Sequence, residues 1–184
     1  MSMPGLPPNA YALLGLLVFD SNSPDSEGMT GYELKQRADF TLRYYWVSPA
    51  MSQIYSELRR LSAEGFVSEV PGEGPTRYRA TPEGAASLQT WLFQGEVGFP
   101  VLKHPVALRL LMGRLSTPEQ LQGMLAQHLD DLADRRADLQ GVRDMLGDDH
   151  ARRYAALVAD WGLAYYDSET QIVTDLRSRL DTMD

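Results

Sequence analysis

Short polar and basic side chains gather on one side of residues 45–61, YWVSPAMSQIYSELRRL. Apolar residues recur there at helical spacing and form the other side, namely Met51, Ile54, Tyr55, Leu58 and Leu61. The polar side carries Ser52, Gln53, Ser56, Arg59 and Arg60. Serine and glutamine can hydrogen-bond base edges in a DNA major groove, and guanidinium groups can reach phosphates. The alternative is an ordinary amphipathic helix, and this stretch alone favours that alternative because solvated faces of this kind are common.

Capping residues mark the two ends of this helix. Ser48 is expected as the N-cap, with Pro49 at the first helical position, where the missing N–H of proline costs nothing. Gly65 follows the last periodic residues, where helices commonly end.

A pair of short strands follows the helix. Residues 66–70 are biased towards apolar side chains, and residues 71–75, Pro-Gly-Glu-Gly-Pro, form a turn cluster. In residues 76–80, Arg77 and Arg79 alternate with Tyr78 and Ala80, as expected for a strand. A helix followed by a hairpin is the layout of a winged helix, whose arginines can straddle a phosphate backbone or enter a minor groove. The alternative is a solvated edge strand that uses charge to block aggregation, but the order of the elements favours DNA binding.

The net charge of −8 opposes this interpretation, because DNA-binding domains are usually basic. Residues 1–95 hold seven Lys/Arg and ten Asp/Glu. All seven basic residues lie in the proposed DNA-reading unit, so the local field would have to attract DNA. We therefore expect modest binding that weakens with salt, with a log–log slope of about −0.9 per neutralised phosphate.

The sequence lacks residue patterns for catalysis. His104, His128 and His150 lie far apart and share no ligand spacing, so no metal site is expected. There is no cysteine, no glycine-rich phosphate loop and no Gly-x-Ser-x-Gly elbow. The Asp130/Asp131 and Asp148/Asp149 pairs are interpreted as solvated helix surface and cap. We expect neither an enzyme nor a cofactor.

The elements before residue 45 would support the reading helix, which is the proposed DNA-contacting helix within residues 45–61. Residues 1–8 are interpreted as a mobile leader, and Asn9 as the N-cap of an almost wholly apolar core helix that extends to Phe19. Thr30 would cap a second helix over residues 31–40. Its Tyr32 and Lys35 are placed to touch phosphates; a core-edge tyrosine and a surface lysine are the alternative.

Aromatic residues precede the reading helix, and another helix follows the wing. Tyr44, Tyr45 and Trp46 are expected to be buried anchors rather than a ligand-stacking site. Thr81 and Pro82 begin a helix whose apolar stripe is Leu88, Trp91, Leu92 and Phe93. The break over residues 95–100 marks a boundary between a winged helix-turn-helix domain, residues 9–95, and a helical domain, residues 96–184.

The second domain is predicted to contain only helices. A short apolar helix is expected over residues 105–115, and a capping box of Thr117 and Gln120 begins a long helix that ends at Leu146. The last helix, about residues 150–180, has an expected stripe of Tyr154, Val158, Trp161, Tyr165, Ile172 and Leu176. A long antiparallel hairpin cannot bury both flanks of its stripe, so a two-fold dimer is expected; a sleeve over the first domain is the alternative. Trp161, Tyr165 and Tyr166 could line a cavity for a small aromatic effector, or pack as core.

No stretch of the sequence has the properties of a targeting or membrane segment. The first basic residue is Lys35, so a secretory signal with a charged start is not expected. The longest apolar run, residues 10–19, is about half of the ~20 residues that a membrane span needs. We expect a cytoplasmic protein without a membrane partner.

Four sequence blocks resemble the PadR family of bacterial transcriptional regulators. They are YALLGLL at 11–17, TGYEL at 30–34, SQIYSELRRL at 52–61 with EGFV at 64–67, and RYRATPEG at 77–84. Tyr44-Tyr45-Trp46 and the long two-helix tail are similar to the branch that contains the virulence-activator proteins. The wing tip departs from the pattern with Glu73, and the loop over residues 20–29 is longer and more acidic than is usual in the family.

The resemblance implies a mainly α fold with a small β-hairpin wing, dimerisation through the C-terminal helices, and a repressor on a roughly palindromic operator. In some relatives a small aromatic ligand releases DNA. The DNA-contacting positions of the family fall on Tyr32, Lys35, Ser52, Gln53, Tyr55, Arg77 and Arg79. Together with the helix face, the expected DNA-binding set also includes Ser56, Arg59 and Arg60. A ligand-sensing or protein-interaction module that has lost DNA binding is the alternative function, motivated by the acidic balance and Glu73.

Overall fold

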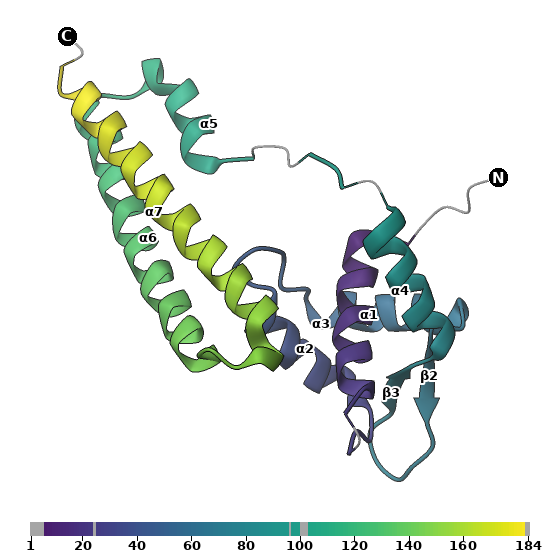
Figure 1. Cartoon of the computed structure of the whole chain (residues 1–184). Coiled ribbons are helices and arrows are strands. Elements are labelled where there is room, and N and C mark those ends of the chain that lie inside the picture. Colours follow the sequence, from purple (N-terminus) through teal and green to yellow (C-terminus); the bar gives the residue numbers. More distant parts are fainter. Residues whose placement is uncertain (1–5, 24, 96, 100–102, 183–184) are drawn as a thin grey trace. The chain divides into compact units, whose positions relative to one another are not determined.

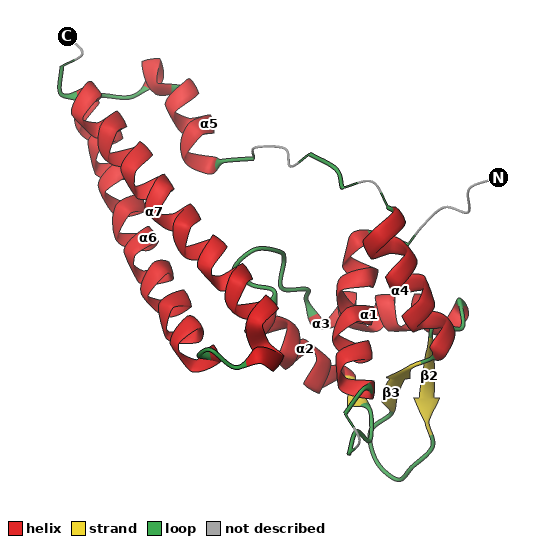
Figure 2. Ribbon diagram, viewed as in Figure 1, coloured by secondary structure: helices red, strands yellow, loops and turns green. Residues whose placement is uncertain are grey.

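The chain forms two compact units, Met1–Gly98 and Phe99–Asp184 (Figures 1 and 2). The computed structural model describes residues 6–23, 25–95, 97–99 and 103–182. The first unit contains α1 (Pro8–Ser21), β1 (Met29–Thr30), α2 (Gly31–Thr41), α3 (Met51–Ala63), β2 (Val67–Val70), β3 (Arg77–Ala80) and α4 (Pro82–Gln94). The second contains α5 (Pro105–Leu111), a 3-10 turn (Gly113–Leu115), α6 (Pro118–Leu146), a second 3-10 turn (His150–Arg152) and α7 (Arg153–Leu180). The predicted fold class, mainly α with a small antiparallel sheet, is confirmed.

Helix α1 lies at the centre of the first unit. Its Leu13, Leu14 and Leu17 are fully buried, together with Leu34 of α2 and Leu58 of α3. Burying one such side chain contributes about 1.5–3 kcal/mol. The expectation that α1 is apolar core all round is wrong at Phe19, whose side chain is exposed near the C-terminal end of the helix. Core packing therefore fixes α2 and α3 against α1.

The start of α1 differs from the expectation. The helix begins at Pro8, with Pro7 as its N-cap, and Leu6 packs against the core. Asn9 does not cap the helix; its Oδ1 accepts a hydrogen bond from Nε1 of Trp46 at 2.8 Å. Residues 6–8 therefore belong to the folded unit, whereas residues 1–5 of the expected leader lie outside the described residues.

The sheet has three strands in the order β1-β3-β2, all antiparallel. Arg77 of β3 pairs with Thr30 of β1 on one side and with Val70 of β2 on the other. The predicted hairpin of β2 and β3 is confirmed, but β3 is the central strand. The alternative of a charged edge strand is therefore wrong, because β1 covers that side of β3.

Two expectations about buried apolar residues are partly wrong. On α4, Leu88 is buried and Trp91 stacks on Tyr11 of α1 with ring centroids 4.8 Å apart, but Leu92 and Phe93 are exposed. Tyr45 and Trp46 are about half exposed rather than buried, although Trp46 is tied to α1 through Asn9. A stripe read from spacing gives the helical period, but the position of the partner helix decides which side of the helix is covered.

In the second unit, α6 and α7 run side by side as an antiparallel pair (Figure 1). Leu125, Leu132 and Leu139 of α6 are buried against α7. Two ion pairs join the helices. Nε of Arg136 lies 2.6 Å from Oδ1 of Asp167, and Nε of Arg143 lies 2.7 Å from Oδ1 of Asp160. The capping box of Thr117 and Gln120 is confirmed. The expected helix over residues 105–115 ends earlier, at Leu111, and is followed by the 3-10 turn.

The side of α7 that faces α6 is not the predicted one. The buried residues are Ala156, Ala159, Leu163, Tyr166 and Val173. The predicted stripe contains Tyr154, Trp161, Tyr165 and Ile172, which are all exposed. Small alanines let the helices approach closely, so the large side chains lie on another side of α7. Among the helices of the described residues, none has the length and apolar character needed to cross a bilayer.

Candidate nucleic-acid interface

Helix α3 presents a polar side to solvent because its apolar side is fixed in the core. Ile54, Leu58 and Leu61 are buried. Ser52, Gln53, Ser56, Arg59 and Arg60 are exposed on the remaining surface. The helix ends at Ala63, and Gly65 follows it as expected, with a φ of 72°. The N–H of Phe66 donates to the carbonyl of Leu61 at 2.9 Å. The described side chains on this face can offer hydroxyl, amide and guanidinium groups to a partner.

The start of α3 corrects the sequence-based expectation. The helix begins at Met51 with Ala50 as N-cap, so Ser48 and Pro49 lie before it. Ala50 has no side-chain acceptor for the first turn, but Gln53 makes the reverse bond of a capping box: its Oε1 accepts a hydrogen bond from the N–H of Ala50 at 2.9 Å. The amide NH₂ remains the part of Gln53 that can donate to a base edge.

Ser48 takes part in a cluster that also holds Lys35. The Lys35 ammonium contacts Asp39 and donates to Oγ of Ser48 at 3.2 Å, and the Ser48 hydroxyl donates to the same Asp39 carboxylate. The hydrogen bond from Lys35, followed by that from Ser48, lowers the pKa of Asp39. This cluster ties α2 to the segment before α3. A contact between Lys35 and a phosphate would compete with it.

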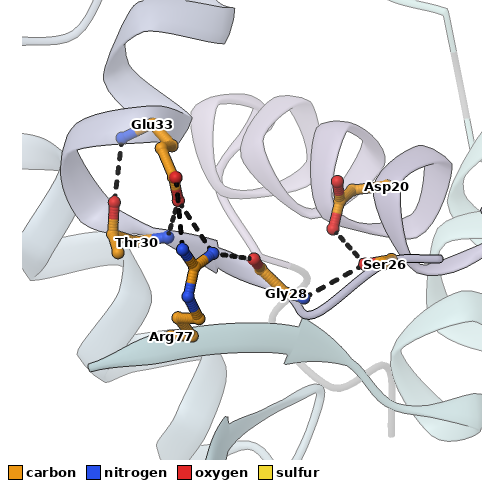
Figure 3. A network of polar contacts seen from close by, with 6 residues as sticks. All are labelled: Asp20, Ser26, Gly28, Thr30, Glu33 and Arg77. Carbon is orange, nitrogen blue, oxygen red and sulfur yellow. Dashed lines mark hydrogen bonds and ion pairs between the residues drawn. The ribbon is translucent and has the colours of Figure 1, made fainter. Parts of the chain in front are cut away.

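Arg77 of the wing points towards the start of α2 (Figure 3). Its Nη1 donates to the carbonyl of Gly28 at 2.6 Å and to Oε2 of Glu33 at 3.2 Å, and Nη2 donates to Oε1 of Glu33 at 3.4 Å. Arg79, on the same face of β3, donates to the carbonyl of Ser26. Both wing arginines therefore bind the loop before β1 in the free chain. Their predicted phosphate contacts would require these bonds to break.

Glu33 links Arg77 to the cap of α2. Its Oε2 accepts from the N–H of Thr30 at 2.8 Å, and the N–H of Glu33 donates to Oγ1 of Thr30 at 3.1 Å (Figure 3). The hydrogen bond from the Thr30 backbone is the main cause of the lowered pKa of Glu33, and the charge of Arg77 adds to it. The predicted Thr30 cap is confirmed, and the acid at the third position completes a capping box.

Tyr32 and Tyr55 have different surroundings. Tyr32 is 61% exposed on α2, and its hydroxyl accepts from Nε2 of Gln36 at 3.2 Å. Tyr55 is half-exposed, and its ring lies so close to Gly31 that an added Cβ would stand 2.7 Å from Cε1. The alternative of a core-edge tyrosine is wrong for Tyr32, whereas Tyr55 packs α3 against the start of α2. Arg60 forms an ion pair with Glu57 at 3.1 Å.

Comparison with known proteins places these elements in a known fold. Residues 102–181 match the family model "Virulence activator alpha C-term". PadR of Bacillus subtilis in complex with operator DNA is 22% identical, with a TM-score of 0.78 over 95% of this chain and 99% of that one. The virulence activator AphA of Vibrio cholerae is 19% identical, with a TM-score of 0.74 over 95% and 99%. The PadR-like regulator BC1756 of Bacillus cereus is also 19% identical, with a TM-score of 0.73 over the same shares. No curated protein matches the sequence.

The chain has the PadR-like fold. Its residues 102–181 match the model of the virulence activator alpha C-terminal family. The resemblance to PadR regulators, and to their virulence-activator branch, that the sequence blocks indicate is therefore confirmed.

The aromatic residues predicted to bind an effector lie in the C-terminal part of this PadR-like fold. Trp161 and Tyr165 are exposed on α7, whereas Tyr166 is buried against α6. Tyr165 and Tyr166 meet edge to face with centroids 6.0 Å apart. Trp161 and Tyr165 thus lie on one side of α7 and Tyr166 on another. Their role as a common ligand site stays a prediction.

Sequence reasoning missed one cluster in this part of the fold. His104, His128 and Glu169 bring their side chains together, although their positions in the sequence share no ligand spacing. The expectation of no metal site rested on that separation, but α5, α6 and α7 bring the three residues together despite it. The available signal was the 3/4 spacing that placed His128 between Leu125 and Leu132 on the α6 seam.

Proposed function

We propose that the chain is a sequence-specific DNA-binding transcriptional regulator that acts as a homodimer on a roughly palindromic operator, as a repressor. The observation that carries the proposal is the exposed polar face of α3, fixed by three buried residues within a winged helix. A solved structure of similar fold, that of B. subtilis PadR, contains operator DNA. A regulator of this kind works in the cytoplasm.

The roles of individual residues follow from their surroundings. Ser52, Ser56 and the amide NH₂ of Gln53 would read base edges, because short side chains let the backbone of α3 approach the groove. Arg59 and Arg60 lie further along the same face and would bind phosphates, with Tyr32 as a further contact from α2. Lys35, Arg60, Arg77 and Arg79 each already have an intramolecular oxygen partner, so a phosphate would have to displace that partner.

Dimerisation is supported by an apolar face on α7. This α7 apolar face consists of Tyr154, Leu157, Trp161, Tyr165 and Ile172, all exposed within one chain. The 3.6-residue period puts them on one side of the helix, away from α6. An exposed apolar patch of this kind marks an interaction site. A second copy is the partner we propose, since it would present the reading helix twice to a two-fold operator.

A small aromatic effector is a further part of this proposal. PadR of B. subtilis has been solved with p-coumaric acid. Trp161 and Tyr165 supply aromatic surface within the proposed dimer contact, and the buried Tyr166 lies against Tyr165. Tryptophan fluorescence during titration with planar aromatic acids would test for effector binding. No response across a broad panel would contradict this part of the proposal.

The proposed function can be tested with DNA from the region upstream of the protein's own gene. A mobility shift at low salt should show specific retardation that excess random DNA does not abolish. Footprinting should then show two protected half-sites about 10 base pairs, one helical turn, apart. A folded protein that binds the two DNAs equally would refute sequence-specific binding.

One observation favours the alternative, a ligand-sensing or protein-interaction module without specific DNA binding. Four of the basic residues proposed for the interface, Lys35, Arg60, Arg77 and Arg79, are held by this unit's own oxygen atoms. If the alternative holds, Lys35→Ala and Arg77→Ala would change the stability of the protein but would leave its DNA affinity unchanged. A well-folded dimer without specific retardation would favour this module.

A further inference from the structure

Three side chains from three helical elements converge in the second unit. His104 is the N-cap residue of α5, His128 lies on α6, and Glu169 lies on α7. Nε2 of His104 is 2.8 Å from Oε1 of Glu169, and Nε2 of His128 is 3.4 Å from the same oxygen. One ligand atom from each residue lies within 4.8 Å of the other two. Two imidazole nitrogens and one carboxylate oxygen thus point at one small volume.

The surrounding packing fixes this cluster. The side chains of His104, His128 and Glu169 are only 15%, 23% and 12% exposed. Buried Leu125 and Leu132 flank His128 one turn away on each side, and buried Tyr166 and Val173 flank Glu169 in the same manner. The imidazole rings meet edge to face, with centroids 5.5 Å apart. Because the α6–α7 seam orients two of the three residues, the convergence follows from core packing rather than from flexible surface side chains.

We propose that His104, His128 and Glu169 bind one divalent transition-metal ion of the zinc class. Imidazole nitrogen and carboxylate oxygen are the ligand types that zinc takes, and three protein ligands leave one position for water or another ligand. Metal–ligand bonds of about 2.0–2.1 Å in a tetrahedron place neighbouring ligand atoms about 3.3 Å apart. The 2.8 Å and 3.4 Å separations lie on either side of that value. Small rotations of the side chains are enough to admit the ion.

The competing form is a cluster held by hydrogen bonds alone. In that form each Nε2 carries a proton and donates to Glu169. Nδ1 of His104 then accepts from the N–H of Ala107 at 3.3 Å, which caps α5. In the metal-bound form the proton of each imidazole moves from Nε2 to Nδ1. His104 can then no longer accept from the N–H of Ala107. Metal binding would therefore break this long hydrogen bond and form a link between α5 and the α6–α7 pair.

The two forms can be separated by metal titration of the untagged full-length chain. Cobalt(II) is expected to bind at one ion per chain and to give the intense visible bands of a low-symmetry site, and zinc should displace it. His104→Ala, His128→Ala and Glu169→Gln should each weaken binding at least about tenfold, since even the loss of outer-shell partners costs that much. Glu169→Gln is the sharpest variant, because its amide can still accept hydrogen bonds from the imidazoles but lacks the anionic ligand.

His150→Ala is the matched control. His150 is exposed, contacts Arg153 and lies in the 3-10 turn before α7. Its loss should leave the affinity and the cobalt spectrum unchanged. In the unmodified protein, zinc should shift the ring ¹⁵N resonances of His104 and His128 but not those of His150, which tests the site even if a variant fails to fold. The proposal is overturned if the chain takes up no stoichiometric ion, if Glu169→Gln binds as tightly as the unmodified chain, or if His150→Ala weakens binding equally.

Discussion

At the scale of single residues, the side chains of the proposed interface differ in how they are constrained. Ser52, Ser56 and Arg59 are exposed on α3. Gln53 is exposed but caps its own helix through Oε1. Lys35 and Arg77 are held by carboxylates of the same unit. This difference separates the residues expected to determine DNA affinity from those expected to determine stability.

Gln53 is predicted to contribute to base recognition through its NH₂ group. Gln53→Glu retains an acceptor for the N–H of Ala50 but replaces the donor by a carboxylate, so it should reduce the ratio of operator to random affinity with little change in thermal stability. One lost base contact corresponds to about 1–3 kcal/mol of discrimination. Fluorescence anisotropy with both DNAs would measure the ratio, with Gln53→Ala as the variant that also loses the cap. An unchanged ratio in Gln53→Glu would remove Gln53 from the base-reading set.

Arg59 is predicted to bind phosphate without reading sequence. Arg59→Ala should weaken operator and random DNA by the same factor and reduce the salt slope by about 1. Arg109→Ala, which removes an exposed arginine of α5, is the control and should change neither quantity. Titrations at four or more salt concentrations provide the slopes. If Arg59→Ala altered only the operator, the residue would belong with the base-reading side chains.

At the scale of elements, the contact between α2 and α3 depends on a missing side chain. Gly31 is the first residue of α2, and the ring of Tyr55 occupies the space that a Cβ would need. Gly31→Ala is therefore expected to destabilise the chain by about 1–3 kcal/mol through overpacking. In a Tyr55→Ala background the same change should be neutral or stabilising, because alanine is a better helix former by about 1 kcal/mol. Urea unfolding of the four proteins tests this, and additive effects would contradict the packing argument.

The capping box of α2 makes a specific pH dependence expected. The pKa of Glu33 is lowered from its ordinary 4.5. Its carboxylate therefore contributes stability above pH 4.5, and that contribution is lost as the pH falls through the lower folded-state pKa. Glu33→Gln should cut the difference in unfolding free energy between pH 6 and pH 3, with the larger effect on the pH 6 value. Thermal melts across this range would measure the difference, and an unchanged pH profile would contradict it.

The sequence predicted most elements of the fold but fewer of the contacts between them. Thr30, Thr81 and Thr117 begin helices as expected, because a cap and its partner lie within one turn. Ser48 fits the same local rule, yet its hydroxyl binds Asp39 and the helix starts later. Arg77 alternates as a wing residue should, but the position of Glu33 decides where it points. Local rules cannot include partners that only the tertiary fold supplies.

At the scale of the whole molecule, the α7 apolar face is expected to form the dimer contact. Trp161→Arg places a charge in that face and should convert the dimer to a monomer, with operator affinity falling because both half-sites must then be bound separately. Ser178→Arg lies on α7 away from this face and is the matched control. Light scattering coupled to gel filtration measures the mass. A dimer that survives Trp161→Arg together with Ile172→Arg would place the contact elsewhere.

The cap at the start of α3 has a consequence for which nucleotide is preferred. An amide whose oxygen faces back along its own helix turns its hydrogens outward before any DNA arrives. Guanine offers two acceptors in the major groove and fits this orientation as it stands, whereas paired recognition of adenine needs a donor and an acceptor together. Rotating the amide to suit adenine would uncap the first turn of the helix. The half-site position opposite Gln53 should therefore favour guanine.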